Sequence, residues 1–346
     1  MFKKTITIVI LFLWRCVVGA QVITGVVCDE VTKLPVSDVY VYLDGTSVNT
    51  VTNNSGKFEL VTRTVFTTKL VLHHLLYETA IIDHPFEELP DTLYIKEQVN
   101  TISEVVVYAD RFSRKQKMQA FREQFLGMSR AGRSCTIMNE DDIYLYFNMQ
   151  SHKLFASSDK PIVVVNNYLG YRISFILIDF WVQYFEANLD YRSIQNSFFA
   201  VVSSFSDIAP DNRRIKQRRD DVYEKSSNYF FKSFANDSLY ANKFVLYNNR
   251  IPVNYQNYFA INDTLSQKQI RIISDTNINR RAYFGSKPSG LISVLYRNVV
   301  QSDIYFMTDT FRVDQYGNID QIDKIFFTGQ MGENRAGDML PIDYEY

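Results

Sequence analysis

The sequence predicts a mainly β protein with some α-helix, in which an N-terminal β-sandwich is followed by a β-rich α+β domain. Glycine (13) and proline (8) are scarce while phenylalanine (26) and tyrosine (23) are abundant, and this balance favours half-buried strands. Between residues 22 and 108, short apolar segments also alternate with closely spaced turn signals. With 46% hydrophobic residues, a chain of 346 residues can build two ordinary cores.

The first twenty residues are predicted to be a secretory signal peptide. Lys3 and Lys4 precede the apolar segment Thr5–Trp14, which is too short to span a bilayer. The small residues Val18-Gly19-Ala20 then form a cleavage site that leaves Gln21 as the new N-terminus. We therefore expect an exported protein that is periplasmic or associated with the outer membrane.

Charge and cysteine content narrow the class of protein further. Cleavage after Ala20 removes three positive charges, which takes the formal net charge from −1 to −4. A mildly acidic protein does not suit sequence-independent nucleic-acid binding, so no nucleic-acid partner is expected. Cys28 and Cys135 remain, in different predicted domains, and we interpret them as buried free thiols. A disulfide between them stays open as the alternative in an oxidising compartment.

The first domain begins with four predicted strands and a turn. Val22–Cys28 alternates weakly and is predicted to be an opening edge strand. Val39–Leu43 is almost continuously apolar, which predicts a central strand with both faces covered. Asn53-Asn54-Ser55-Gly56 then predicts a hairpin between Thr50–Thr52 and Lys57–Leu60, because asparagine and glycine tolerate the backbone of tight turns.

Four further short strands complete the predicted sandwich. They are Lys69–His74, Glu78–Ile82, Thr92–Ile95 and Glu104–Tyr108. Seven or eight short strands within so few residues, with turn signals at close spacing, are typical of a small β-sandwich.

At this point the residues resemble a known family. The matching positions are Ile23-Thr24-Gly25, Thr32 with Pro35, Val39-Tyr40-Val41 with Gly45-Thr46, Thr52-Asn53, Gly56-Lys57-Phe58 and Glu104-Val105-Val106-Val107. Val22–Tyr108 is thereby similar to the carboxypeptidase regulatory-like domain, a transthyretin-like sandwich at the N-termini of many exported proteins of Gram-negative bacteria. The family usually has a glycine–tyrosine step where this chain has Leu75-Leu76-Tyr77.

The resemblance implies a structural or docking module without peptidase chemistry. It implies structural roles for six residues, which are Gly25, Pro35, Gly45, Thr46, Asn53 and Gly56.

The second predicted domain spans residues 110–346 and opens with a helix. Met118, Phe121, Phe125 and Met128 recur at helical spacing within Arg111–Met128, and the basic residues between them are interpreted as a solvated face. Strands are then predicted at Ile143–Phe147, Leu154–Ala156, Pro161–Val165, Arg172–Tyr184 and Phe198–Phe205.

A second helical stripe runs through Arg213–Phe234. Five of the seven residues of Arg213–Arg219 are basic, and Asp220 and Asp221 follow at once. We interpret this cluster as a solvated, internally paired helical face. Strands follow at Lys243–Tyr247, Gln269–Ile273, Leu291–Tyr296, Ile304–Thr308 and Lys324–Thr328.

The second domain carries a weaker resemblance. Phe121–Gly127, Cys135 with Ile137 and Asn139, Asn166–Tyr171, Arg219–Phe234 and Asp338–Pro341 look like the C-terminal part of a group of exported carboxypeptidase regulatory-like proteins. That group brings no assigned activity to this chain.

The sequence contains no catalytic motif that predicts an enzyme. His84 and Glu87 have the His-x-x-Glu spacing of zinc carboxypeptidases, but they fall inside the predicted sandwich, so a zinc site is rejected. Nucleophile-elbow, His-Glu-x-x-His and phosphate-loop motifs are all missing from the sequence. Asp314–Asp320 lacks the spacing of a calcium loop and is interpreted as a turn. We expect no catalytic residue, cofactor or metal.

The sequence thus favours a non-enzymatic cell-envelope protein, in which the sandwich docks or supports and the second domain binds an unknown envelope protein or glycan. One alternative is a small outer-membrane β-barrel with a periplasmic sandwich, since Leu340, Ile342, Tyr344 and Tyr346 alternate towards the end of the sequence. Pro341 and the polar second helix argue against it. The other alternative is an uncharacterised glycan or peptide hydrolase.

Overall fold

The protein is mainly β, as the sequence predicts, and its described residues gather around three large hydrophobic cores. The computed structural model describes residues 21–346 except 64, 66, 99–110, 265–266 and 274–289. The predicted signal peptide and the predicted strand Glu104–Tyr108 lie outside these described residues. No helix within the described ranges is long and apolar enough to cross a membrane.

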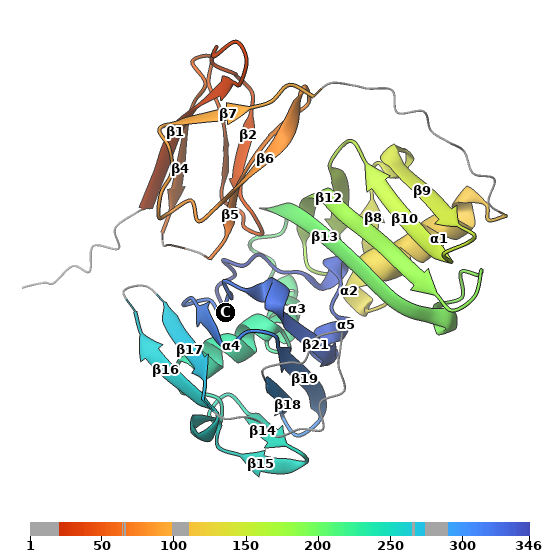
Figure 1. Ribbon diagram of the computed structural model, residues 1–346, viewed down its shortest axis with the longest axis vertical. Coiled ribbons are helices and arrows are strands. Elements are labelled where there is room, and N and C mark those ends of the chain that lie inside the picture. The colour runs from red at the N-terminus through yellow and green to blue at the C-terminus, as the bar shows by residue number, and fades with distance from the viewer. Residues whose placement is uncertain (1–20, 64, 66, 99–110, 265–266, 274–289) are drawn as a thin grey trace, which may run out of the picture.

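The N-terminal core belongs to a β-sandwich formed by residues 21–98, which we call the sandwich (Figure 1). One sheet has the order β4-β1-β7 and the other has the order β3-β2-β5-β6. The strands are β1 (Gln21–Asp29), β2 (Tyr40–Leu43), β3 (Asn49–Val51), β4 (Lys57–Thr62), β5 (Lys69–His74), β6 (Tyr77–Asp83) and β7 (Thr92–Ile95). β2 pairs with β3 and β5, which confirms the predicted central strand.

Two details of the predicted sandwich are wrong. β1 is the middle strand of its sheet, because it pairs with β4 on one side and in parallel with β7 on the other. The turn at Asn53–Gly56 forms, with the Asn53 N–H donating to the Lys57 carbonyl at 3.0 Å, but β3 and β4 lie in different sheets and form no hairpin. Both corrections depend on partners remote in sequence, which local alternation does not specify.

The second core lies between a helix and a six-stranded sheet, which together we call the middle region (Figure 1). The sheet has the order β8-β11-β12-β10-β9, and β13 pairs with the opposite edge of β12. Its elements are α1 (Arg114–Phe125), α2 (Arg130–Arg133), β8 (Cys135–Ile137), β9 (Ile143–Asn148), β10 (Lys153–Ser158), β11 (Ile162–Asn166), β12 (Tyr171–Tyr184) and β13 (Ile194–Asp207). A capping box between Ser113 and Gln116 begins α1. The predicted helix is confirmed for its buried stripe of Met118, Phe121 and Phe125, but Met128 lies beyond its end and is 45% exposed.

Along the strand β12, the side chains that face the core are odd-numbered in the first half and even-numbered in the second half. Tyr171, Ile173 and Phe175 face the core, and after a bulge between Leu177 and Asp179 the even-numbered residues from Phe180 onwards do so. The extra residue restores the apolar face over the full length of the strand. Phe125 of α1 contacts both parts of this surface, with its ring centroid 5.3 Å from Phe175 and 6.5 Å from Phe180.

The third core fills the C-terminal lobe, residues 213–333. Two helices lie against sheets of order β15-β14-β18-β19-β21 and β16-β17-β20. The elements are α3 (Arg213–Tyr223), α4 (Ser227–Ala235), β14 (Phe244–Asn248), β15 (Ile251–Val253), β16 (Phe259–Asp263), β17 (Lys268–Ile272), β18 (Gly290–Tyr296), β19 (Val300–Phe306), β20 (Thr310–Val313), β21 (Ile325–Gly329) and α5 (Gln330–Glu333). Short 3-10 helices lie at Glu140–Asp142, Tyr191–Ser193, Tyr255–Asn257, Ile322–Lys324 and Ala336–Asp338.

The basic helical face is only partly as predicted. Lys216 pairs with Asp220 one turn away, and Arg213 and Arg214 are exposed. Arg219, however, is only 5% exposed, donates to both carboxylate oxygens of Asp207 at 2.7 Å, and lies 3.9 Å from the Tyr171 ring centroid. The prediction of a uniformly solvated face is therefore wrong, because β13 supplies a carboxylate that the local sequence does not reveal.

The last eight residues, Met339–Tyr346, run back between the three cores, and we call them the C-terminal segment. Leu340 packs against the cores of both the middle region and the C-terminal lobe. Ile342 packs against the sandwich core and Tyr344 belongs to the lobe core. The C-terminus accordingly lies below the sandwich, between it and the lobe (Figure 1).

Candidate functional site

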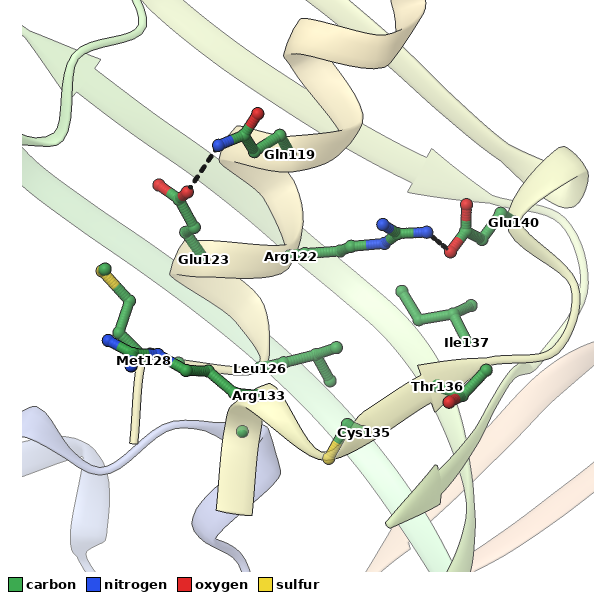
Figure 2. Close-up of a pocket in the computed structure, with 12 residues that line it drawn as sticks. Gln119, Arg122, Glu123, Leu126, Met128, Arg133, Cys135, Thr136, Ile137 and Glu140 are labelled. Atoms are coloured by element: carbon green, nitrogen blue, oxygen red, sulfur yellow. Dashed lines mark hydrogen bonds and ion pairs between the residues drawn. The ribbon is translucent and has the colours of Figure 1, made fainter. Parts of the chain in front are cut away.

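A groove between α1 and β8 is a candidate binding site in the middle region. Figure 2 shows α1 forming one wall and β8 the other, with the Arg122 side chain reaching towards Glu140. Its volume is about 390 Å³, which lies in the range of small-ligand sites. The lining residues are Gln119, Arg122, Glu123, Leu126, Gly127, Met128, Gly132, Arg133, Cys135, Thr136, Ile137 and Glu140.

The thiol of this groove is not set up as a nucleophile. Burial, with a smaller contribution from the charge of Asp338, raises the pKa of Cys135 to about 12. Its Sγ lies 3.4 Å from the carbonyl oxygen of Ala131. A thiol with this pKa is almost fully protonated at neutral pH, and the thiolate is the reactive form. Cys135 and Cys28, which is buried in the sandwich, are both free cysteines.

The charged groups of the groove are mostly paired with one another. Arg122 forms an ion pair with Glu140, and the Gln119 amide donates to Glu123 at 3.0 Å. Among the described residues none pairs with the guanidinium of Arg133, which lies in the same groove. Paired polar groups and apolar walls of this kind can hold a small ligand or a peptide.

His84 and Glu87, rejected as a zinc site, lie in the loop between β6 and β7. They line a pocket of about 340 Å³ together with Arg312 and Asp320 of the C-terminal lobe. Over the described ranges, no group of three or more histidine, cysteine, aspartate or glutamate side chains is placed to hold a metal ion. The fold therefore brings His84 and Glu87 into one pocket with two charged residues of the lobe.

Four of the six residues singled out as structural act inside the sandwich. A Cβ at Gly56, whose φ is +69°, would lie 2.4 Å from the Val27 carbonyl and 3.1 Å from Pro35. A Cβ at Gly25 would lie 2.8 Å from the Phe58 ring. The Asn53 side chain accepts the N–H of Ser55 at 2.9 Å and so closes the turn. These positions fix close approaches between chain segments.

The other two, Gly45 and Thr46, fasten the sandwich to the middle region. The Gly45 N–H donates to the Ser203 carbonyl at 2.7 Å, and the Phe205 N–H donates to the Thr46 carbonyl at 2.9 Å. Thr46 also forms a parallel bridge with Ser204. The Ile342 N–H of the C-terminal segment donates to the Gly45 carbonyl at 2.8 Å. We call these contacts the Gly45 junction.

Apolar contacts extend the Gly45 junction. Tyr42 and Val71 of the sandwich form a buried cluster with Val202 of β13, and Ile176 packs against it. The Tyr40 hydroxyl lies 2.9 Å from the Ser204 hydroxyl. The sheet containing β2 is therefore covered on its outer face by β13, and the two domains share buried surface.

A carboxyl group is buried at the same junction. Asp44 accepts the Ser203 N–H at 2.7 Å, and burial raises the pKa of Asp44 to about 6. Asp343 of the C-terminal segment accepts the Ser47 hydroxyl at 3.0 Å, and burial raises the pKa of that carboxyl also. No sequence motif predicts this cluster, because its members come from separate parts of the chain.

The exposed face of the middle sheet carries a row of aromatic side chains, which we call the aromatic row. Tyr146, Phe155, Trp181 and Phe198 lie directly opposite one another on β9, β10, β12 and β13. Ring centroids are 6.3 Å apart for Tyr146 and Phe155 and 5.9 Å apart for Trp181 and Phe198. Phe198 is 46% exposed. Sequence composition predicts sheet aromatics, but only strand register aligns them.

Comparison with known proteins identifies the N-terminal part of the chain. Residues 23–107 match the family model described as CarboxypepD_reg-like domain. A search of curated proteins finds no match. The matched family is a regulatory-like domain rather than a catalytic one, so the protein contains a CarboxypepD_reg-like domain folded as the sandwich.

Proposed function

We propose that this protein is a non-enzymatic component of the cell envelope, in which the sandwich is a structural module and residues 110–346 bind a partner. The predicted signal peptide supports export to the periplasm or to the outer membrane. The regulatory-like type of the matched domain supports a role without catalysis.

The Gly45 junction is the observation that carries this proposal. The loop that the family resemblance marks as structural is hydrogen-bonded to β13 and to the C-terminal segment, and the outer sheet face beside it is buried. These contacts cover Tyr42 and Val71 on the outer face of the sheet that contains β2, so this part of the sandwich is not free to dock onto a partner. The sandwich therefore holds the middle region in a fixed position, and residues 110–346 bind the partner.

Two surfaces of the middle region suit a partner. The groove between α1 and β8 offers apolar walls and the guanidinium of Arg133, with which no residue in the described part of the chain pairs. The aromatic row offers half-exposed rings on the same sheet face that already binds the sandwich through Ile176 and Val202. Aromatic side chains are enriched in the energetically dominant parts of interfaces. An envelope protein or a glycan is the partner class that we propose.

Cross-linking in envelope fractions tests the proposal. A chain beginning at Gln21 should capture a defined partner, and capture should fall when Trp181 and Phe198 are replaced by alanine, or when Arg133 is replaced by glutamate. Tyr240→Ala is the matched control, because Tyr240 is 90% exposed and lies in the C-terminal lobe. Peptide or glycan hydrolysis that is lost in Glu123→Gln or Glu140→Gln would contradict the proposal.

A further inference from the structure

We propose that the groove between α1 and β8 binds an extended peptide, which adds as a new strand to β8 and places a carboxylate beside Arg133. This inference rests on the proposed function, since it names the partner class for one of the two surfaces. It follows from the free edge of β8, the walls of the groove and the distribution of charge.

The edge of β8 offers unused backbone hydrogen-bonding groups. β8 pairs with β11 on one side, and among the described residues no strand pairs with its other side. The Met138 N–H donates to the Val163 carbonyl at 2.8 Å. Because pairing alternates along an antiparallel ladder, the N–H and C=O of the preceding residue, Ile137, point away from β11. An open edge of this kind is a template for a further strand.

The edge is held in a fixed position. The Ile137 side chain is buried in the core beneath α1, together with Leu126 at the end of that helix. The Asn139 side chain accepts the Val163 N–H at 2.9 Å and donates to the Pro161 carbonyl at 3.0 Å, which anchors the exit from β8. A preorganised edge loses little conformational entropy when a peptide pairs with it.

The groove has the shape that an added strand requires. Figure 2 shows α1 and β8 as its two walls, with Leu126 and Ile137 between them. A peptide strand advances about 3.3 Å per residue, so three residues would extend about 10 Å along β8. Alternate side chains of that peptide would face the apolar residues of the groove, while its backbone pairs with β8. Main-chain bonds then give affinity and side-chain contacts give specificity.

The charged residues of the groove favour a peptide with a carboxylate at one end. Arg122 and Glu140 neutralise each other, and the Glu123 carboxylate accepts the Gln119 amide. Arg133 is the groove cation that no described residue pairs, and Figure 2 places it beside Met128, away from the Arg122–Glu140 pair. A guanidinium can bind a carboxylate through two parallel hydrogen bonds. A glutamate, aspartate or C-terminal carboxylate at this end of the peptide is the complementary group.

Fluorescence anisotropy tests the inference with a synthetic probe. The probe is a short fluorescein-labelled peptide of alternating threonine and valine that ends in glutamate. A second peptide carries N-methyl groups on alternate backbone nitrogens, and a third ends in lysine amide. The proteins are the chain from Gln21, its Arg133→Glu variant, and its Arg130→Glu variant as the matched control. Arg130 lies on the same short helix, is exposed, and does not line the groove.

Strand addition predicts saturable binding of the first peptide to the unmodified protein. Arg133→Glu should weaken binding at least about tenfold, whereas Arg130→Glu should change it less than about twofold. N-methylation should weaken binding at least about tenfold, because it removes the donors that pair with β8. The lysine-amide peptide should bind at least about tenfold more weakly than the glutamate peptide. Equal thermal unfolding curves for the two variants would establish that both are folded.

Three results would overturn the inference. They are no binding at about 1 mM protein, equal weakening by the two arginine variants, or equal binding of the N-methylated peptide. If an envelope partner is captured through Trp181 and Phe198 while the peptide fails to bind, the inference falls and the proposed function stands. If no partner is captured but the peptide binds as described, the groove is a peptide site and the envelope role falls.

Discussion

The amide of Gly45 donates a 2.7 Å hydrogen bond to the carbonyl of Ser203, and this bond joins a loop of the sandwich to the central hairpin of the middle region. The carbonyl of Gly45 accepts the Ile342 N–H of the C-terminal segment at 2.8 Å. One residue thus connects three segments that are remote in sequence. Through Gly45, the sandwich is hydrogen-bonded to both the middle region and the C-terminal segment.

Replacing Gly45 should weaken this connection. Gly45 has φ of +72°, where a side chain is strained, and a Cβ there would lie 3.2 Å from the Cγ2 of Ile342. Gly45→Val should therefore lower the free energy of unfolding by about 2 kcal/mol. Urea denaturation measures this change. The exposed turn residue Asn54 provides a control, and Asn54→Ala should change stability by less than about 0.5 kcal/mol. Equal stability of the Gly45 and Asn54 variants would contradict the role of the junction.

The buried carboxyl of Asp44 should make stability depend on pH. Its pKa is about 6 in the folded protein against an ordinary value of 3.8, so the folded state retains the proton over this interval. The resulting stabilisation is fully present below pH 3.8 and is lost as the pH rises through about 6. Relative to Asp44→Asn, the unmodified protein should lose up to about 3 kcal/mol of unfolding free energy across this range.

Urea midpoints between pH 4 and pH 7.5 provide the measurement for Asp44. The comparison with Asp44→Asn removes the contributions of other groups, including Asp343. Asparagine retains an oxygen that can accept the Ser203 N–H, so the variant changes charge with little change of shape. A difference between the two proteins that is constant with pH, or that grows in favour of the unmodified protein as the pH rises, would contradict this assignment.

Arg219 should be the most sensitive residue of the basic helix. Its guanidinium donates to both oxygens of Asp207 and also to the carbonyls of Leu169 and Gly170, at 2.7 and 3.0 Å. Arg219→Ala would leave a partly buried carboxylate and two carbonyls without this partner, at a cost of about 3 to 5 kcal/mol. Thermal unfolding measures the loss. Arg213→Ala, at an exposed position of the same helix, should change stability by less than about 0.5 kcal/mol, and a similar loss in both variants would refute the distinction.

Sequence patterns predicted the longer elements because burial imposes a clear period on them. β5, β9 and β12 fall where apolar residues alternate or cluster, and α1 falls where they recur at helical spacing. The three-residue strands β8 and β15 were missed, since so short a segment shows no period. One helical stripe was predicted over Arg213–Phe234, but the structure has two helices there, α3 and α4, separated by residues 224–226.

The candidate site was less predictable than the fold. Gly45 and Thr46 were singled out as turn residues of the sandwich, but their partners Ser203 and Phe205 lie in another domain. The groove likewise lies between α1 and β8, and β8 is held in the sheet by its pairing with β11. A single sequence carries no local signal for such contacts between remote segments. Residue type indicates that a position is special, and the fold determines what it contacts.

Amide hydrogen exchange at Gly45 and Phe205 tests most directly whether the sandwich is fixed to the middle region. In the folded protein both amides are hydrogen-bonded across the Gly45 junction, so they should exchange as slowly as the amide of Val27 in the sandwich core, which donates to the Gly56 carbonyl at 2.8 Å. If the Gly45 and Phe205 amides exchange as fast as the exposed turn amide of Asn54, the Gly45 junction is open and the sandwich is not fixed to the middle region.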